Sequence, residues 1–197
     1  MADSSTVKVP HAEKQAEQLT RLFLTNRDFQ LALSAVTFLL QDVDWDASYS
    51  VPDLRRFYCY EAAMVVSYVR PFTQSRGGAR PFSWKDISVK LDDAEKALHE
   101  RLVVDRNKLF AHSDADYVEL RRVIFRMRMP GRRKPLDFAM VRFNEWVRLS
   151  TKECLTAQQL LHRALHAIIE KTQTIDLQDA GFRLIGGSGE SKPIKRR

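Results

Sequence analysis

Apolar side chains recur with the period of an α-helix along most of this chain, and the period changes only near residue 118. Seven glycines and seven prolines are few for 197 residues, and most stand between the helical segments. Because either residue weakens or breaks a helix from within, this placement leaves long uninterrupted helices. The sequence therefore predicts a mainly α-helical protein, built as a bundle of four to five helices.

The helical pattern has clear starts and stops. Ser50 and Pro52 are typical of a helix start, and Pro71 ends the segment that follows them. Ser150, with Glu153 three residues later, marks the start of the last helix. Residues 25–27 interrupt the apolar pattern and predict a break between the first two helices. The expected helices cover residues 11–24, 28–41, 50–70, 92–110 and 151–172.

Within residues 118–129 the side chains alternate as they do in a β-strand. The apolar odd positions are Val123, Phe125, Met127 and Met129, and the basic even positions are Arg122, Arg126 and Arg128. A turn-forming segment and a second β-favouring segment follow, so an antiparallel hairpin is expected at about 118–147. Its first strand should carry one exposed, positive face. The alternative is a helix, because helical spacing is also shown by Tyr117, Leu120, Ile124 and Met127.

The net charge of +7 favours an anionic partner, with nucleic acid first. No run of about 18 apolar residues and no apolar signal core occurs, so we expect a cytoplasmic protein without a membrane span. Cys59 and Cys154 are interpreted as buried free thiols. His162 and His166 have the spacing of a metal pair but no carboxylate companion, so they are interpreted as solvated or core-edge histidines. Neither a cofactor nor a metal is expected.

The ends of the chain differ in composition from its middle. Residues 1–9 are small and polar and are expected to be disordered. A single domain is expected over 10–174. Residues 175–197 are expected to form an extension and a flexible basic tail.

A compact polar set closes the helical pattern at 92–110. Arg106 can hold phosphate oxygens in a planar fork, and His112 can transfer a proton near neutral pH. Asn107 adds an amide beside them, and Asp105 precedes them. On an ideal α-helix, however, Arg106 and His112 are about 120° apart around the axis and about 9 Å apart along it. One straight helix would not aim both side chains at one phosphate, so a bend or a second protomer is required.

Glu61 lies within an apolar stripe of the helix at 50–70, where an unpaired carboxylate is costly to bury. It is expected to find a partner in Arg106, in His112 or in a helix-end amide. Bound in this way, Glu61 would help to hold Arg106, Asn107 and His112 in position. The simpler alternative is a glutamate that pairs with an arginine and only locks two helices together.

The hairpin carries most of the remaining candidate contacts to nucleic acid. Its basic side chains would steer a phosphate backbone, or would only keep an exposed face soluble. They are Arg122, Arg126, Arg128, Arg132, Arg133 and Lys134.

The segment from Arg106 to His112, Arg-Asn-Lys-Leu-Phe-Ala-His, resembles the motif of the HEPN superfamily, an arginine, a polar residue and a histidine a few positions on. The resemblance covers roughly 31–112 and the last helix, and within the superfamily it points to toxin-type, AbiU-like members. It implies a HEPN-like bundle of four to five helices, with the antiparallel β-hairpin inserted before the last helix. The hairpin is not part of the minimal family pattern and leaves the subfamily open.

The resemblance also implies a function. Many HEPN proteins are dimeric, metal-independent endoribonucleases of toxin–antitoxin or phage-defence systems. By matching position, Arg106 and His112 would be the catalytic pair and Asn107 their polar neighbour. A homodimer would place two such sets across one cleft, RNA would be the substrate, and an antitoxin of the nucleotidyltransferase type is a candidate partner. The alternatives are a non-catalytic HEPN-type module that binds RNA or protein, and a helical interaction domain unrelated to nucleic acid.

Overall fold

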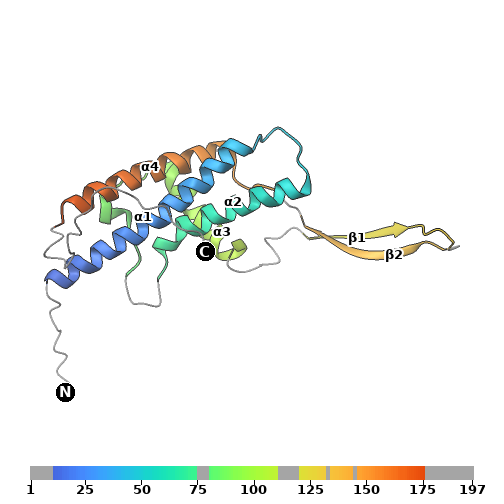
Figure 1. The fold of residues 1–197 in the computed structure, drawn as a ribbon, viewed down its shortest axis with the longest axis horizontal. Coiled ribbons are helices and arrows are strands. Elements are labelled where there is room, and N and C mark those ends of the chain that lie inside the picture. The colour runs from blue at the N-terminus through green and yellow to red at the C-terminus, as the bar shows by residue number, and fades with distance from the viewer. Residues whose placement is uncertain (1–10, 75–79, 111–119, 132–133, 144–145, 176–197) are drawn as a thin grey trace, which may run out of the picture.

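The computed structural model describes residues 11–74, 80–110, 120–131, 134–143 and 146–175. Within these residues lie four α-helices and one two-stranded antiparallel sheet. The helices pack as a bundle, and the hairpin extends away from one end of it (Figure 1). The mainly helical class and the position of the hairpin before the last helix are therefore as predicted.

Helix α1 (His11–Asp42) is continuous, so the predicted break at 25–27 is wrong. None of the three residues there is glycine or proline, and their helix propensities lie within about 0.7 kcal/mol of that of alanine. Packing outweighs so small a preference. Thr25 is 2% exposed, and the neighbouring Asp28 accepts a hydrogen bond from Arg70 Nη1 at 2.7 Å.

The other helices begin at the residues that cap them. Helix α2 (Val51–Val69) has Ser50 as its N-cap, and the 3-10 turn η1 (Arg70–Phe72) follows it. A second 3-10 turn, η2 (Trp84–Ile87), leads to α3 (Asp93–Asp105). Helix α4 (Thr151–Gln173) starts with a capping box of Ser150 and Glu153. These local signals satisfy the first free amides of each helix, and for this reason the starts were predictable.

The core lies between α1, α2 and α4, with α3 against α2 and α4. Glu95 ties α3 to α4, because both of its carboxylate oxygens accept from Arg163 Nη2 at 2.8 Å. The large side chains that are almost fully buried include Leu22, Phe29, Leu39, Phe57, Met64, Tyr68, Leu102, Leu160, Leu161 and Ile168.

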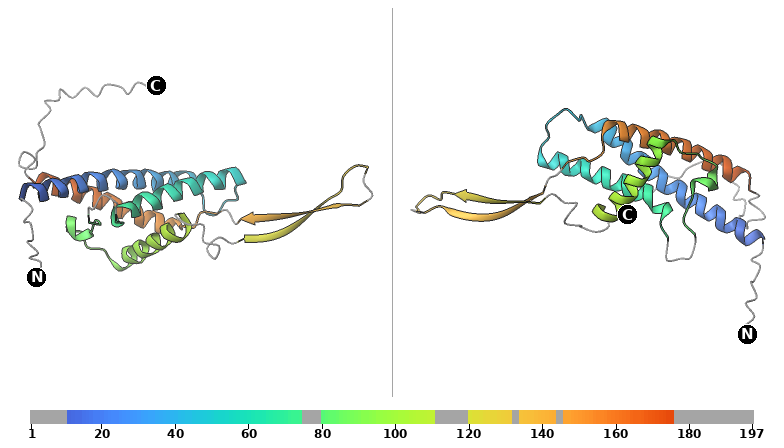
Figure 2. Two further views of the ribbon diagram at one scale, coloured as in Figure 1. Left: turned by 90° about the horizontal axis from the view of Figure 1, so that it is seen from below. Right: turned by 180° about the vertical axis from the view of Figure 1, so that it is seen from behind.

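Strands β1 (Leu120–Met127) and β2 (Leu136–Phe143) form the hairpin, so the helical alternative for this segment does not hold. The register runs from Leu120 opposite Phe143 to Met127 opposite Leu136, and Gly131 takes φ +82° in the turn. Among the described residues the two strands contact each other and no helix. The hairpin leaves the bundle at the end where α1 passes into α2, as both views of Figure 2 show.

In the part of the chain that the structure describes, no helix combines the length and the apolar character that a membrane span requires.

Candidate functional site

The candidate motif begins where helix α3 changes its geometry. From Arg106 to Phe110 the chain forms a π-helical turn, η3, in place of the α-helix expected up to residue 110. Single π-turns are rare and occur frequently at functional sites. Arg106 is half-buried, and its Nη1 donates to Asn107 Oδ1 at 3.0 Å. The first two residues of the motif therefore form one joined polar group at the edge of the bundle.

The π-turn changes the backbone geometry from which the separation of Arg106 and His112 was calculated. The 120° separation of Arg106 and His112 holds for an α-helix, and the chain stops being α-helical at Arg106. His112 itself lies outside the described residues. Before the turn, α3 turns one side to the core, because Leu98, Leu102 and Asp105 are all buried.

Glu61 projects from the buried side of α2 and is 1% exposed. Its Oε1 accepts hydrogen bonds from the backbone N–H groups of Arg148 and Leu149, each at 2.8 Å. Of the three expected kinds of partner, the helix-end amide is therefore the one observed. Glu61 locks α2 to the start of α4 through the backbone amides of these two residues.

The second carboxylate oxygen of Glu61 is also buried and has no hydrogen-bond partner among the described residues. Burial raises the pKa of Glu61 to about 7, and the charge of Asp105 adds to the rise, while the two amide hydrogen bonds oppose it. A proton on this carboxyl group is therefore present in a large share of molecules near neutral pH.

Asp105, the other supporting residue, is 6% exposed and belongs to a network at the end of α3. Arg101 Nε lies 3.4 Å from Asp105 Oδ2, and Arg101 Nη2 donates to the carbonyl oxygen of Arg148 at 2.8 Å. A third contact joins Arg101 to Glu153. The network fixes the end of α3, from which the π-turn starts, against the start of α4.

Sequence reasoning missed Arg101, and it expected a helix-end amide at Glu61 without identifying Arg148 and Leu149 as the residues that supply it. The signal for Arg101 was present, since it stands four residues before Asp105, the spacing of a helical ion pair. The amides carried no signal, because any residue type offers a backbone N–H group.

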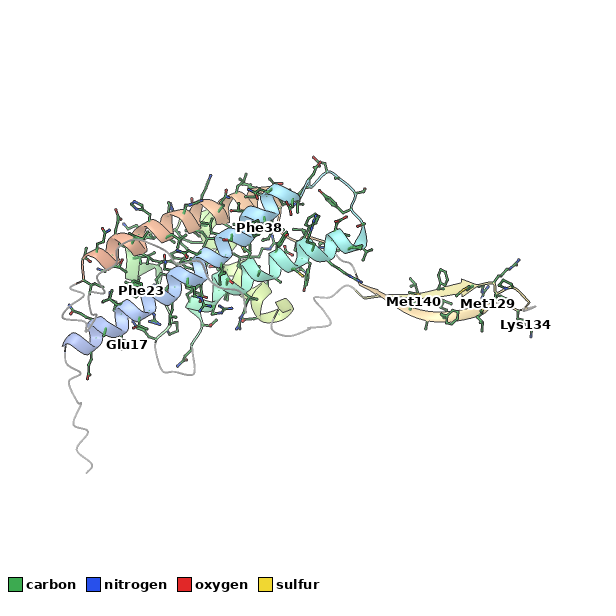
Figure 3. The ribbon with its side chains drawn as sticks, in the orientation of Figure 1. Glu17, Phe23, Phe38, Met129, Lys134 and Met140 are labelled. Carbon is green, nitrogen blue, oxygen red and sulfur yellow. The ribbon has the colours of Figure 1, made fainter. Side chains whose placement is uncertain are left out.

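The basic residues of the hairpin differ in their availability. Arg126 forms a two-armed ion pair with Asp137, its neighbour across the ladder, at 2.7 and 2.8 Å. Arg128 and Lys134 are exposed, and Figure 3 shows Lys134 at the far end of the hairpin. The side chain of Arg122 and the residues Arg132 and Arg133 lie outside the described part. The basic face of the hairpin therefore contains one ion pair, between Arg126 and Asp137, that the alternating sequence pattern did not predict.

Other candidate side chains are placed away from the motif. His162 and His166 are exposed on α4, and His166 lies 3.6 Å from Glu170. Cys154 is buried, and burial raises the pKa of its thiol to about 12. Cys59 is exposed, which corrects the expectation of two buried thiols.

Comparison with known proteins returns no match, whether the chain is set against protein-family models, curated proteins or solved structures.

Proposed function

We propose that the chain is a metal-independent endoribonuclease of the HEPN type, acting in a toxin–antitoxin or phage-defence system. The observation that carries the proposal is the π-turn that begins at Arg106. It joins Arg106 and Asn107 at the edge of the bundle, directly after the buried Asp105. A cation and an amide held this way suit the oxygens of a phosphodiester.

In the proposed reaction RNA supplies its own nucleophile. The 2′-hydroxyl attacks the adjacent phosphorus, its proton passes to a base, and the bond from phosphorus to the 5′-oxygen breaks as that oxygen takes up a proton. His112 acts as the base or as the acid. Arg106 stabilises the charge of the pentacoordinate intermediate, and Asn107 donates to a phosphate oxygen. The products are a 2′,3′-cyclic phosphate and a 5′-hydroxyl.

The proposal includes a homodimer in the cytoplasm, in which two motif turns act on one RNA. The exposed cations Arg128 and Lys134 attract the RNA backbone. In the cell the partner that silences the enzyme would be an antitoxin, for which a nucleotidyltransferase is the candidate.

The test is cleavage of single-stranded RNA in EDTA. We expect the wild type to produce 2′,3′-cyclic phosphate ends and His112→Ala to lose the activity. His166→Ala is the matched control, because it removes an exposed histidine from α4, and it should cleave as the wild type does. RNA that stays intact with the wild type at high enzyme concentration would refute the proposal.

A second candidate is a non-catalytic HEPN-type module that binds RNA or protein. The exposed apolar hairpin favours it, since such surfaces mark interaction sites. This candidate predicts binding of RNA or protein that survives His112→Ala, with no cleavage by the wild type.

A further inference from the structure

The net positive charge of the chain is concentrated in the hairpin. Residues 120–143 contain eight lysines and arginines and one acidic residue, Asp137, which give this segment a net charge of +7. The whole chain also has a net charge of +7, so the residues outside the hairpin sum to zero. The hairpin is therefore the part of the chain to which a polyanion is attracted.

One face of this charged hairpin is apolar over three consecutive residue pairs. The register places Val123 opposite Met140, Phe125 opposite Phe138, and Met127 opposite Leu136. Since directly paired residues point to the same side of a sheet, these six side chains share one face, called here the apolar hairpin face. Met140 is seen on the hairpin well away from the bundle (Figure 3).

The centre of the apolar hairpin face is an exposed aromatic pair. No described helix contacts the strands, and Phe125 and Phe138 are 50% and 42% exposed. The matching place on the opposite face is taken by Ile124 and Ala139, which have no π system. Exposed aromatic rings are the side chains on which the bases of single-stranded nucleic acids stack.

Cations stand at both ends of the apolar hairpin face. The ladder pairs Arg121 with Arg142 at the end next to the bundle, and Arg128 and Lys134 are exposed at the tip. Six residue steps separate Arg121 from Met127, a length of about 20 Å. The one carboxylate of the hairpin, Asp137, lies on the opposite face and is paired there with Arg126. This arrangement matches a strand that has phosphates at both ends of the face and bases between them.

We propose that the apolar hairpin face binds single-stranded RNA, with unpaired bases stacked on Phe125 and Phe138 and phosphates of the same strand bound by the cations at the two ends. In a duplex the faces of the bases are covered by their neighbours, so only unpaired bases reach the two rings. The inference rests on the proposed function and adds the form of RNA that the enzyme takes. Residues 111–119 alone separate the motif turn η3 from β1.

A protein partner fits the face less well, and so does a second copy of this chain. Outside the hairpin the chain has no net charge, and a second hairpin would bring seven more charges of the same sign. At about 200 Å² per large side chain, the exposed parts of the two phenylalanines and two methionines amount to roughly 400 Å². A standard protein interface takes about 800 Å² per partner, whereas stacking uses only the faces of the rings.

A lipid bilayer with acidic headgroups also offers negative charge. Both strands of a two-stranded hairpin are edges, however, and their outer N–H and C=O groups would lose water inside the hydrocarbon without gaining a partner. Bases that stack on one face leave those edges in water. RNA therefore satisfies the charge and the apolar face together.

The experiment measures the affinity of the full chain for a labelled 2′-O-methyl oligoadenylate by fluorescence anisotropy. This probe lacks the free 2′-hydroxyl that acts as nucleophile in the proposed reaction, so it stays intact. Phe125→Ile keeps an apolar, β-favouring side chain and removes the π face. We expect it to raise the dissociation constant about 10-fold, and Phe138→Ile to do the same.

The matched control is Ile124→Thr, which keeps a β-branched side chain at the adjacent position on the opposite face. It should change the dissociation constant by less than about 2-fold. A wild type without affinity for the probe at low salt, or equal effects of Phe125→Ile and Ile124→Thr, would overturn the proposal.

A duplex separates stacking from attraction to phosphates. Pairing the probe with 2′-O-methyl oligouridylate leaves only backbone contacts, so Phe125→Ile should bind this duplex as the wild type does. Arg128→Ala should weaken the binding of single strand and duplex alike and reduce its dependence on salt. A loss in Phe125→Ile that is as large for the duplex as for the single strand would contradict stacking.

Two further measurements keep the test decisive if an isoleucine variant folds poorly. Phe125→Trp keeps an aromatic face, and the probe should quench its added fluorescence more than that of Ile124→Trp; equal quenching would overturn the proposal. Vesicles of phosphatidylcholine and phosphatidylserine should not retain the wild type. Retention on these vesicles by a chain without affinity for the probe would assign the face to a membrane instead.

Failure of this inference and failure of the proposed function are distinguishable. A chain that cleaves no ordinary RNA, but whose binding of the probe is weakened by Phe125→Ile, would support the stacking face and refute the enzyme. A chain that cleaves single-stranded RNA with the same KM in the wild type and in Phe125→Ile would support the enzyme and refute the stacking face.

Discussion

At the scale of single residues, Glu61 has a setting unlike that of a surface carboxylate. It holds two amides with one oxygen, while the other oxygen is buried without a partner among the described residues. The folded state therefore favours the protonated form, and the pKa is raised from 4.5 to about 7. The contribution of the Glu61 carboxyl group to the free energy of unfolding is fully present below pH 4.5, and it is lost as the pH rises through about 7.

The first prediction follows from that sign. Between pH 5 and pH 8 the free energy of unfolding of the wild type should fall by up to about 3 kcal/mol more than that of Glu61→Gln. Glutamine keeps an oxygen for the two amides but cannot ionise. Urea unfolding of both proteins at the two pH values measures the difference, and an identical pH dependence would rule out a raised pKa at Glu61.

The second prediction concerns the role of Arg106 in RNA cleavage and rests on the proposed function. Arg106→Lys keeps the positive charge but loses the planar fork. The rate of RNA cleavage should fall by about 100-fold or more. Arg56→Lys, at an exposed arginine paired with Asp53 on α2, is the control and should keep the wild-type rate. Equal rates for all three proteins would remove Arg106 from the chemistry.

At the scale of elements, the attachment of α3 decides how firmly the motif turn is held. Glu95 is 5% exposed, caps the start of α3 with Asp92, and binds Arg163 of α4. The ion pair is therefore held at one end by a buried, well-bonded carboxylate. Because Arg163 is half exposed, solvent screening reduces what the pair contributes.

The third prediction concerns this link. Arg163→Ala should lower the free energy of unfolding by about 1 kcal/mol, with the loss limited by screening. Lys96→Ala is the matched control, because its partner Asp93 is fully exposed, and it should change stability by less than about 0.5 kcal/mol. Chemical denaturation measures both. An Arg163→Ala protein as stable as the control would show that the pair contributes nothing.

At the scale of the whole molecule, bundle and hairpin are separable. Their strands and helices make no contacts within the described residues, and Leu120 and Phe143 are neighbours across the ladder. A short connection can therefore close the chain where the hairpin is removed.

The fourth prediction uses this arrangement. Replacing residues 121–142 by a short glycine–serine linker should leave the free energy of unfolding of the bundle within about 0.5 kcal/mol of the wild-type monomer. Denaturation measures this difference, and a bundle that unfolds would show that the hairpin supports it.

The features predicted correctly from the sequence are those that depend on residues close together in the chain. Ser50 and Ser150 gave the helix starts, because a cap and its amides lie within three residues of each other. The break at 25–27 failed because weak propensities yield to packing. The alternating pattern of apolar and basic residues predicted the hairpin and its two faces. It does not indicate which face a partner would cover. Around the motif, the helix-end amide for Glu61 was among the predicted options, whereas the π-turn had no signal in the apolar period.

Leu149 is held at both of its backbone groups. Its N–H binds Glu61, 88 residues earlier, and its carbonyl oxygen binds Trp45, 104 residues earlier. Closing so long a loop carries a large entropy loss, and contacts of such separation slow folding. The antiparallel pair α1 and α2 and the hairpin can each form from near neighbours first. The order of folding should therefore end with α4, whose docking at Leu149 joins α2 and the loop after α1 and completes the bundle.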